Sequence, residues 1–125
     1  MKELTRAEEQ VMQILWELEK ANVREVVSHF PDPKPAYTTV ATVMNALEKK
    51  GFADKIPAGK SHLFAVKISK EDYSGFKAGA LVKNYFNGSF SRMASFFAKD
   101  NKLSIQELEE MIQIAKDQID REKDV

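Results

Sequence analysis

The sequence predicts a mainly α-helical fold with one small β-hairpin near the middle of the chain. Three observations carry this prediction. Apolar residues recur at helical spacing in the first 50 residues, and two short alternating segments follow residue 51. Three more amphipathic segments, two of them with caps, follow residue 68. With 125 residues, the chain is long enough for one domain or for a small domain with an appendage.

The first helix is predicted to begin after Thr5. Thr5 and Glu8 have the spacing of a capping box, in which each side chain binds the free backbone N–H of the other residue. The apolar residues that follow repeat at helical intervals: Val11, Ile14, Leu15 and Leu18. A second cap at Asn22 predicts a short helix, and prolines at positions 31, 33 and 35 exclude a helix from the connection after it.

The third helix is predicted from about Thr38 to Gly51, because glycine is typical of a helix C-terminus. One side of this helix is apolar and contains Val40, Val43, Met44 and Leu47. At about 100° per residue, the opposite side is polar and contains Thr38, Thr42, Asn45 and Lys49. This polar side has little relief, so it can approach another surface closely.

Two strands are predicted after the third helix, over Phe52–Ile56 and His62–Ile68, joined by a glycine-containing loop over residues 57–61. Three helices followed by a β-hairpin around one small core describe a winged helix-turn-helix. We therefore expect a winged-helix DNA-binding domain over residues 1–68, with a wing of two or three strands.

Residues 69–125 are predicted to form three further helices, with caps at Ser69 and Ser104 and breaks at Asn87-Gly88 and near Asp100-Asn101. Three short amphipathic helices cannot close a core by themselves, so we expect a helical dimerisation domain in which two copies complete each other's core. The alternative is a monomer in which these helices fold back on the first domain. The expected dimer contacts are Phe86, Phe90, Met93, Phe97, Leu108, Met111, Ile112, Ala115 and Ile119.

The charges are unevenly distributed, although 19 basic and 19 acidic residues give a net charge of zero. Residues 34–67 contain six lysines and two acidic residues, a net charge of +4. Residues 103–125 contain seven acidic and three basic residues, a net charge of −4. This pattern predicts an anion-binding surface in the middle of the chain. The alternative is that both segments are ordinary solvated faces.

The polar side of the third helix and the hairpin together form the strongest candidate site. An α-helix fits the major groove of DNA, where Thr, Asn and Lys side chains can read base edges. We expect Asn45 to pair with adenine, Lys60 at the hairpin tip to reach a phosphate or the minor groove, and His62 to flank the hairpin. Lysines at positions 34, 49, 50, 55 and 60 can replace phosphate counterions. The alternative is an ordinary surface helix with a lysine-rich end.

No enzyme class finds support in the sequence. The absence of cysteine excludes disulfides, iron–sulfur clusters, thiolate zinc sites and cysteine nucleophiles. The two histidines, His29 and His62, do not have the spacing of a metal pair, and His29 is interpreted as structural. We predict no catalytic residue, no metal and no cofactor. Because no membrane span or signal peptide is recognisable, we expect a cytoplasmic protein without direct membrane binding.

Four segments resemble the penicillinase-repressor family, the BlaI/MecI type. They are Leu4–Glu8 with the apolar residues after it, Thr39–Gly51 with its closing Lys-Lys-Gly, Tyr85–Ser89 and Leu103–Leu108. They occur in the order and spacing of the family and extend over nearly the whole chain.

This resemblance implies a bacterial winged-helix repressor that binds a palindromic operator in double-stranded DNA as a homodimer. It implies control of β-lactamase or related resistance genes, and inactivation when a membrane sensor metalloprotease triggers cleavage in the C-terminal region. By position in the family's motif, the residues facing DNA are Thr38, Thr39, Thr42, Asn45, Lys49 and Lys50, and the wing contributes Lys60 and His62.

Three features depart from the family pattern. Staphylococcal-type members have basic residues where this chain has Thr38, Ala41 and Ala46, so a different operator sequence is expected. The family's cleaved Asn–Phe bond aligns with Phe96-Phe97, and the cysteine cluster of copper-responsive members is absent. A rival function is a protein-interaction adaptor that uses a winged-helix fold without binding DNA.

Overall fold

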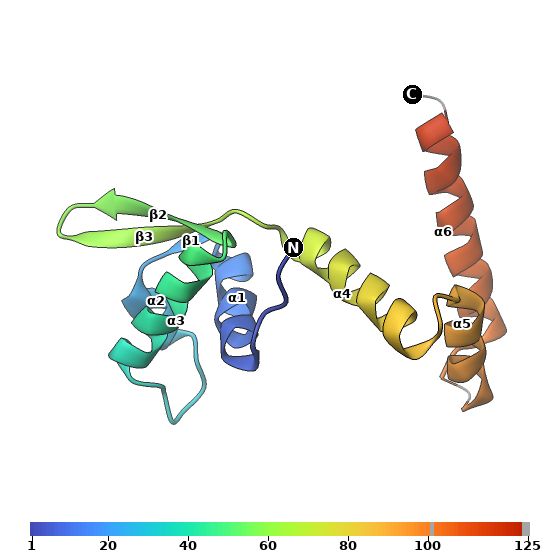
Figure 1. Cartoon of the computed structure of the whole chain (residues 1–125), viewed down its shortest axis with the longest axis horizontal. Coiled ribbons are helices and arrows are strands. Elements are labelled where there is room, and N and C mark those ends of the chain that lie inside the picture. Colours follow the sequence, from blue (N-terminus) through green and yellow to red (C-terminus); the bar gives the residue numbers. More distant parts are fainter. Residues whose placement is uncertain (101, 124–125) are drawn as a thin grey trace. The chain divides into compact units, whose positions relative to one another are not determined.

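The structure is a computed structural model that describes residues 1–100 and 102–123, and the chain divides into two compact units, Met1–Ala78 and Gly79–Val125 (Figure 1). The elements, in chain order, are α1 (Arg6–Leu18), β1 (Lys20–Ala21), α2 (Val23–Ser28), α3 (Tyr37–Lys49), β2 (Ala53–Ala58), β3 (Ser61–Val66), α4 (Lys70–Tyr85), α5 (Phe90–Lys99) and α6 (Ile105–Lys123). This order confirms the predicted winged helix-turn-helix followed by three helices. The expected functional boundary at residue 68 stays a prediction.

Side-chain caps fix the starts of α1 and α2 as the sequence predicts. The Thr5 N–H donates to Glu8 Oε1 at 2.8 Å, and the Glu8 N–H donates to Thr5 Oγ1 at 3.2 Å. Asn22 and Glu25 make the same reciprocal pair at the start of α2. Helix α3 has Ala36 at its N-cap and no side-chain cap, and it begins one residue before the predicted Thr38.

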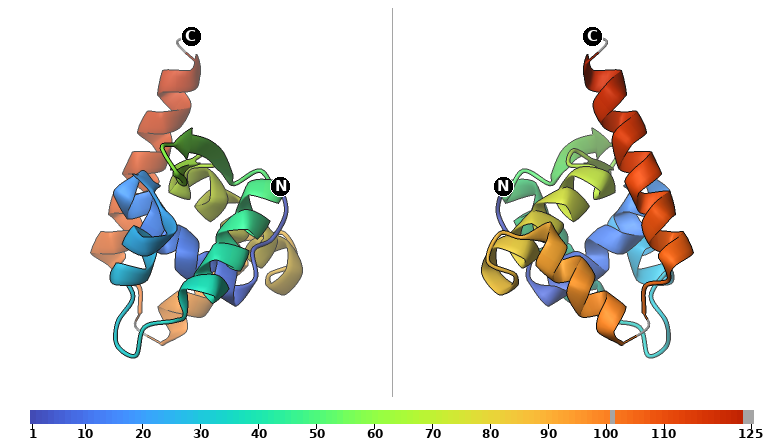
Figure 2. Two further views of the ribbon diagram at one scale, coloured as in Figure 1. Left: turned by 90° about the vertical axis from the view of Figure 1, so that its left-hand side faces the viewer. Right: turned by 90° about the vertical axis from the view of Figure 1, so that its right-hand side faces the viewer.

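The core of the first unit lies where α1, α2 and α3 meet the sheet. In Figure 1 the three helices gather on one side of the hairpin, and the two views in Figure 2 show the same grouping. The Trp16 indole N–H donates to the Ile68 carbonyl at 2.9 Å and so ties α1 to the segment after β3. The fully buried large side chains are Met12, Leu15, Val26, Val40, Met44, Leu47 and Phe52.

The sheet has three antiparallel strands in the order β1-β3-β2, which places β2 at an edge. The predicted strand bounds and five-residue loop are wrong, because β2 continues to Ala58 and Ser61 pairs with it. An edge strand tolerates Pro57, since the N–H that proline lacks is not needed there. Gly59, with φ of 64°, then closes a two-residue turn with Lys60. Strand β3 ends at Val66, two residues earlier than predicted.

The second unit contains α5, α6 and the last turns of α4. Ser89 caps α5 by accepting the Arg92 N–H at 3.1 Å, and Ser104 caps α6 by accepting the Glu107 N–H at 3.1 Å. Phe96 lies between Phe86 and Phe97, with ring centroids 5.8 and 5.6 Å apart. The helix break predicted at Asp100-Asn101 falls partly on Asn101, which lies outside the described residues.

Most of the residues expected at a dimer contact are exposed in the single chain. Phe86 and Met93 are half-buried, whereas Phe90 is 66% exposed and neither α5 nor α6 has a buried residue. On α6 an exposed apolar stripe, here named the α6 stripe, runs along one side: Leu108, Met111, Ile112, Ala115 and Ile119. None of the helices within residues 1–100 and 102–123 is both long and apolar enough to span a bilayer.

Candidate nucleic-acid interface

Helix α3 presents a polar surface, as its sequence periodicity predicts. Val40, Met44 and Leu47 are buried on the inner side, which leaves the polar positions outward. We name the outward set the polar face; it consists of Thr38, Thr39, Thr42, Asn45 and Lys49. All are exposed except Asn45, which is half-buried, and the Thr42 hydroxyl donates to the Thr38 carbonyl at 2.9 Å.

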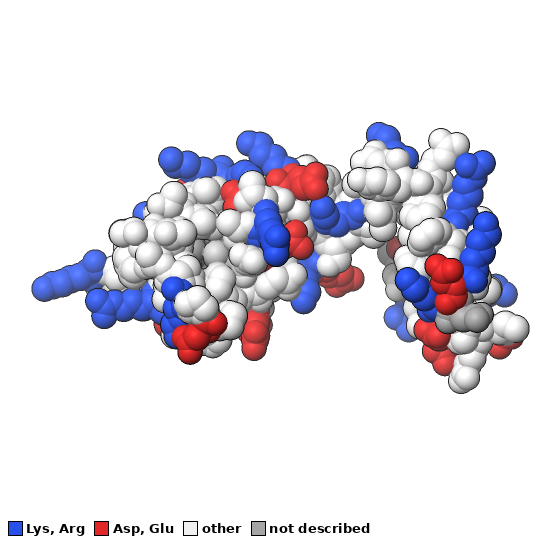
Figure 3. All heavy atoms as spheres, turned by 90° about the horizontal axis from the view of Figure 1, so that it is seen from below, with Lys and Arg blue, Asp and Glu red and all other residues white. Residues whose placement is uncertain are grey.

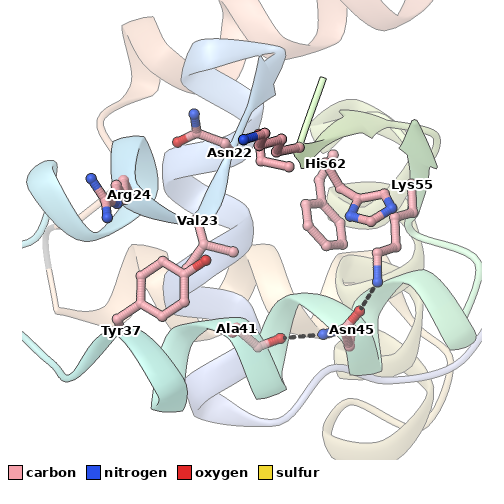
Figure 4. A pocket seen from close by; sticks show the side chains of 11 residues that line it. Asn22, Val23, Arg24, Tyr37, Ala41, Asn45, Lys55 and His62 are labelled. Atoms are coloured by element: carbon pink, nitrogen blue, oxygen red, sulfur yellow. Dashed lines mark hydrogen bonds between the residues drawn. The ribbon is translucent and has the colours of Figure 1, made fainter. Parts of the chain in front are cut away.

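A hollow of about 530 Å³ lies between the start of α2, helix α3 and the hairpin (Figure 4). Its lining brings together three of the predicted site residues, Asn45, Lys60 and His62. It also includes Arg24 and Tyr37, which sequence reasoning missed. Both are exposed, and the signal that could have found them is their position, just after the Asn22 cap of α2 and at the first residue of α3. The whole lining is Asn22, Val23, Arg24, Tyr37, Ala41, Asn45, Lys55, Lys60, Ser61, His62 and Phe64.

The amide of Asn45 is bound at both ends within the protein. Its Nδ2 donates to the Ala41 carbonyl at 2.9 Å, and its Oδ1 accepts from Lys55 Nζ at 2.9 Å (Figure 4). The same Lys55 ammonium lies 5.8 Å from the centroid of the Phe64 ring. Lys55 therefore bridges the edge strand of the wing and the polar face of α3.

Lys50 forms an ion pair within the protein, although the family resemblance places it among the residues that face DNA. Its Nζ donates to Glu8 Oε1 at 2.5 Å, and only 26% of the Lys50 side chain and 8% of the Glu8 side chain are exposed. Burial by itself would raise the pKa of the Glu8 carboxyl, but the hydrogen bonds from Lys50 and Thr5 and the lysine charge together lower this pKa. The pair fastens the C-terminal end of α3 to the first turn of α1.

The other basic residues of the region have different surroundings. Lys34 donates to the carbonyls of Ser28 and Phe30 at 3.2 and 2.7 Å, so it closes the end of α2. Lys49 and Lys60 are exposed, and neither makes an ion pair with the residues that the structure describes. Figure 3 shows basic side chains projecting at the hairpin end of the first unit. Lys49 and Lys60 are therefore free to bind a polyanion.

The histidines show no metal-binding arrangement. His29 Nδ1 lies 2.8 Å from the Glu25 carbonyl at the end of α2, and His62 is exposed on β3. Within residues 1–100 and 102–123, no group of three or more His, Cys, Asp or Glu side chains is placed to hold a metal ion.

Comparison with known proteins gives a consistent result over nearly the whole chain. The sequence model of the family described as penicillinase repressor matches residues 4–117. The penicillinase repressor of Bacillus licheniformis is 25% identical over 123 residues, which are 98% of this chain and 96% of that protein. The methicillin resistance regulatory protein MecI of Staphylococcus aureus strain N315 is 25% identical over 110 residues, 87% of this chain and 89% of that protein.

A solved structure supports the fold of the first unit. The solution structure of the DNA-binding domain of the repressor BlaI matches with a TM-score of 0.50 and 26% sequence identity. The match covers 58% of this chain and 94% of that domain. It confirms the winged-helix architecture, and together with the family match it confirms the resemblance drawn from sequence segments.

Proposed function

The chain belongs to the penicillinase repressor family, a family of transcriptional repressors, and on this premise we propose that it binds a palindromic operator as a homodimer. In this proposal α3 enters the major groove and the wing follows the phosphate backbone. The observation that carries it is the exposed polar face of α3 beside the lysine-bearing hairpin.

The proposed contacts divide by chemistry. Thr38, Thr39, Thr42 and Asn45 offer hydroxyl, methyl and amide groups, which read base edges. Lys49 and Lys60, with His62, supply charge or hydrogen bonds to phosphates, which fix the register without selecting a sequence. Lys50 is assigned instead to holding α3 in place, because Glu8 occupies its ammonium.

The dimer is proposed from the exposed apolar surface of the second unit. Helix α6 has 19 residues and none of them is buried, although the α6 stripe is apolar along most of its length. A helix in water draws most of its stability from packing such a stripe against a partner. A second copy provides an identical stripe, and the two-fold symmetry of that pair demands a palindromic operator.

The regulated genes and the release signal are proposed from the named relatives. These relatives are a penicillinase repressor and a methicillin resistance regulator, so we assign β-lactamase-type or related resistance genes to this repressor.

A membrane sensor metalloprotease is the proposed upstream partner, whose signal leads to cleavage of the repressor. The bond that aligns with the family's cleaved Asn–Phe bond is Phe96-Phe97, and it lies exposed in α5. An immunoblot of cells before and after β-lactam treatment tests this step; an uncut chain during induction would contradict it.

Fluorescence anisotropy tests the proposed DNA binding directly. The protein is titrated onto DNA from upstream of its own gene and onto scrambled DNA, at salt concentrations from about 50 to 200 mM. We expect a preference of about a thousandfold for one upstream site, with affinity that falls steeply with salt. Equal, weak binding to every fragment tiled across the genome would contradict a specific repressor. Absence of binding at any salt would favour the adaptor function.

A further inference from the structure

We infer that Lys55 is a positioning residue for sequence reading, because it fixes the orientation of the Asn45 amide that faces the major groove. The inference rests on the proposed function and deepens it. Lys55 lies on β2, ten residues from Asn45, and its ammonium reaches across the hollow to α3 (Figure 4).

The hydrogen-bonding capacity of the amide explains what the lysine does. An asparagine side chain has two N–H donors and an oxygen with two lone pairs. The Ala41 carbonyl takes one donor, and the Lys55 ammonium takes one lone pair. One donor and one acceptor remain, and they complement the N7 acceptor and N6 donor that adenine presents in the major groove.

The two partners also fix which end of the amide lies where. If the amide turned over, its N–H donors would face the Lys55 ammonium and its oxygen would face the Ala41 carbonyl. Both contacts would be repulsive, so only one orientation is allowed. Without Lys55, the Ala41 carbonyl alone would remain to orient the amide.

The position of Lys55 is itself held by the wing. Its ammonium lies 5.8 Å from the centroid of the Phe64 ring, within the range of a cation–π contact, and Lys55 and Phe64 are directly paired across β2 and β3. The buried Phe64 ring therefore restrains the lysine, and the lysine restrains the amide. Such preorganisation improves discrimination because the correct geometry exists before DNA arrives.

The test compares discrimination among operators, not affinity alone. Wild type, Asn45→Ala, Lys55→Met, Lys55→Arg and the double variant Asn45→Ala/Lys55→Met are titrated onto the operator and onto operators with single base changes. Asn45→Ala identifies the base pair that Asn45 reads, as the position where discrimination falls by roughly fivefold or more. At that same position we expect Lys55→Met to reduce discrimination by about threefold or more, and Lys55→Arg, which keeps a donor, to restore it.

The double variant should discriminate no worse than Asn45→Ala alone, because the lysine acts through the amide. Lys60→Met is the matched control: a lysine that binds only phosphate lowers affinity for all sequences and flattens the salt slope by about one unit, without changing discrimination. If Lys55→Met behaves like Lys60→Met, or if Asn45→Ala changes discrimination at no position, the inference is overturned. Failure of wild type to prefer any operator would instead overturn the proposed function.

Discussion

Glu8 serves two elements at once. Its carboxylate accepts the Thr5 N–H in the capping box of α1 and accepts the Lys50 ammonium from the end of α3. Because this side chain is nearly buried, removing either partner would leave a charged group poorly solvated. The sequence predicted the capping box from local spacing. It could not predict the lysine, which lies 42 residues away and meets Glu8 only through the packing of α1 on α3.

Replacement of Glu8 by Gln is expected to lower the free energy of unfolding at pH 7 by about 2 kcal/mol, typical of a hydrogen bond to a charged group. The folded protein lowers the pKa of this carboxyl, so its contribution is fully present above the ordinary value of 4.5 and is lost as the pH falls below it. The difference between wild type and Glu8→Gln should therefore shrink in acid. Urea unfolding at pH 7 and near pH 3.5 measures this difference.

Glu3→Gln provides the control for that experiment. Glu3 and Lys77 also form a Glu–Lys pair, at 2.7 Å, but the Glu3 side chain is 67% exposed and the Lys77 side chain 42% exposed. An exposed pair contributes little to stability, so this variant should unfold like wild type at both pH values. Equal losses from Glu3→Gln and Glu8→Gln would contradict the role given to burial.

The candidate site shows the same division between local and tertiary information. Helical periodicity placed every residue of the polar face except Thr39 on one side of α3, because that pattern depends only on neighbouring turns. Thr39 came from the family resemblance. The hydrogen bond between Asn45 and Lys55 depends on how the wing lies against α3. No local sequence pattern at either residue predicts it. Arg24 and Tyr37 were missed for the same reason, since the hollow that they line is formed by three separate elements.

At the scale of elements, the wing was misjudged because the predicted loop over residues 57–61 included Pro57, Ala58 and Ser61, which belong to the strands. Pro57 pairs with His62 inside the hairpin, and it does so because β2 is an edge strand. Strand order is a property of the sheet as a whole, so no local rule could supply it. The consequence is a tight turn that holds Lys60 at the hairpin tip, where the longer predicted loop would have left it mobile.

Helix α6 gives the prediction that belongs to this scale. Ile112→Asp should convert a dimer to a monomer, because it places a charge in the middle of the α6 stripe. Ile114→Asp is the control: Ile114 is also an exposed isoleucine of α6 but lies outside the α6 stripe. Sedimentation velocity measures both variants. A dimer that survives Ile112→Asp, or one that Ile114→Asp disrupts equally, would show that the contact lies elsewhere.

At the scale of the whole molecule, the first unit is closed by a contact between its two sequence ends. The Leu4 N–H donates to the Tyr73 hydroxyl at 2.9 Å, although 69 residues separate them. Tyr73 is only 3% exposed and lies against Trp16, Phe52 and Phe76. The start of α4 is thus part of the winged-helix core, and the compact unit extends to Ala78.

Tyr73→Phe is expected to lower the free energy of unfolding of the first unit by about 1–2 kcal/mol, because the buried Leu4 N–H loses its acceptor while the ring packing is kept. Tyr85→Phe, at an exposed tyrosine of the same helix, should leave stability unchanged. Thermal unfolding followed by Trp16 fluorescence reports on the relevant unit, since Trp16 contacts Tyr73. Equal midpoints for Tyr73→Phe and wild type would contradict a structural role for this hydrogen bond.

The closure of Leu4 on Tyr73 also sets the order in which the protein can mature on the ribosome. A nascent chain that ends at the wing already contains α1, α2, α3 and the hairpin, but it lacks the ring that completes their core. The DNA-reading unit therefore reaches its final form only after the first turn of α4 has emerged, while the apolar helices of the second unit are still being made. In the proposed dimer, each subunit would complete its own core before the apolar surface of its second unit is exposed.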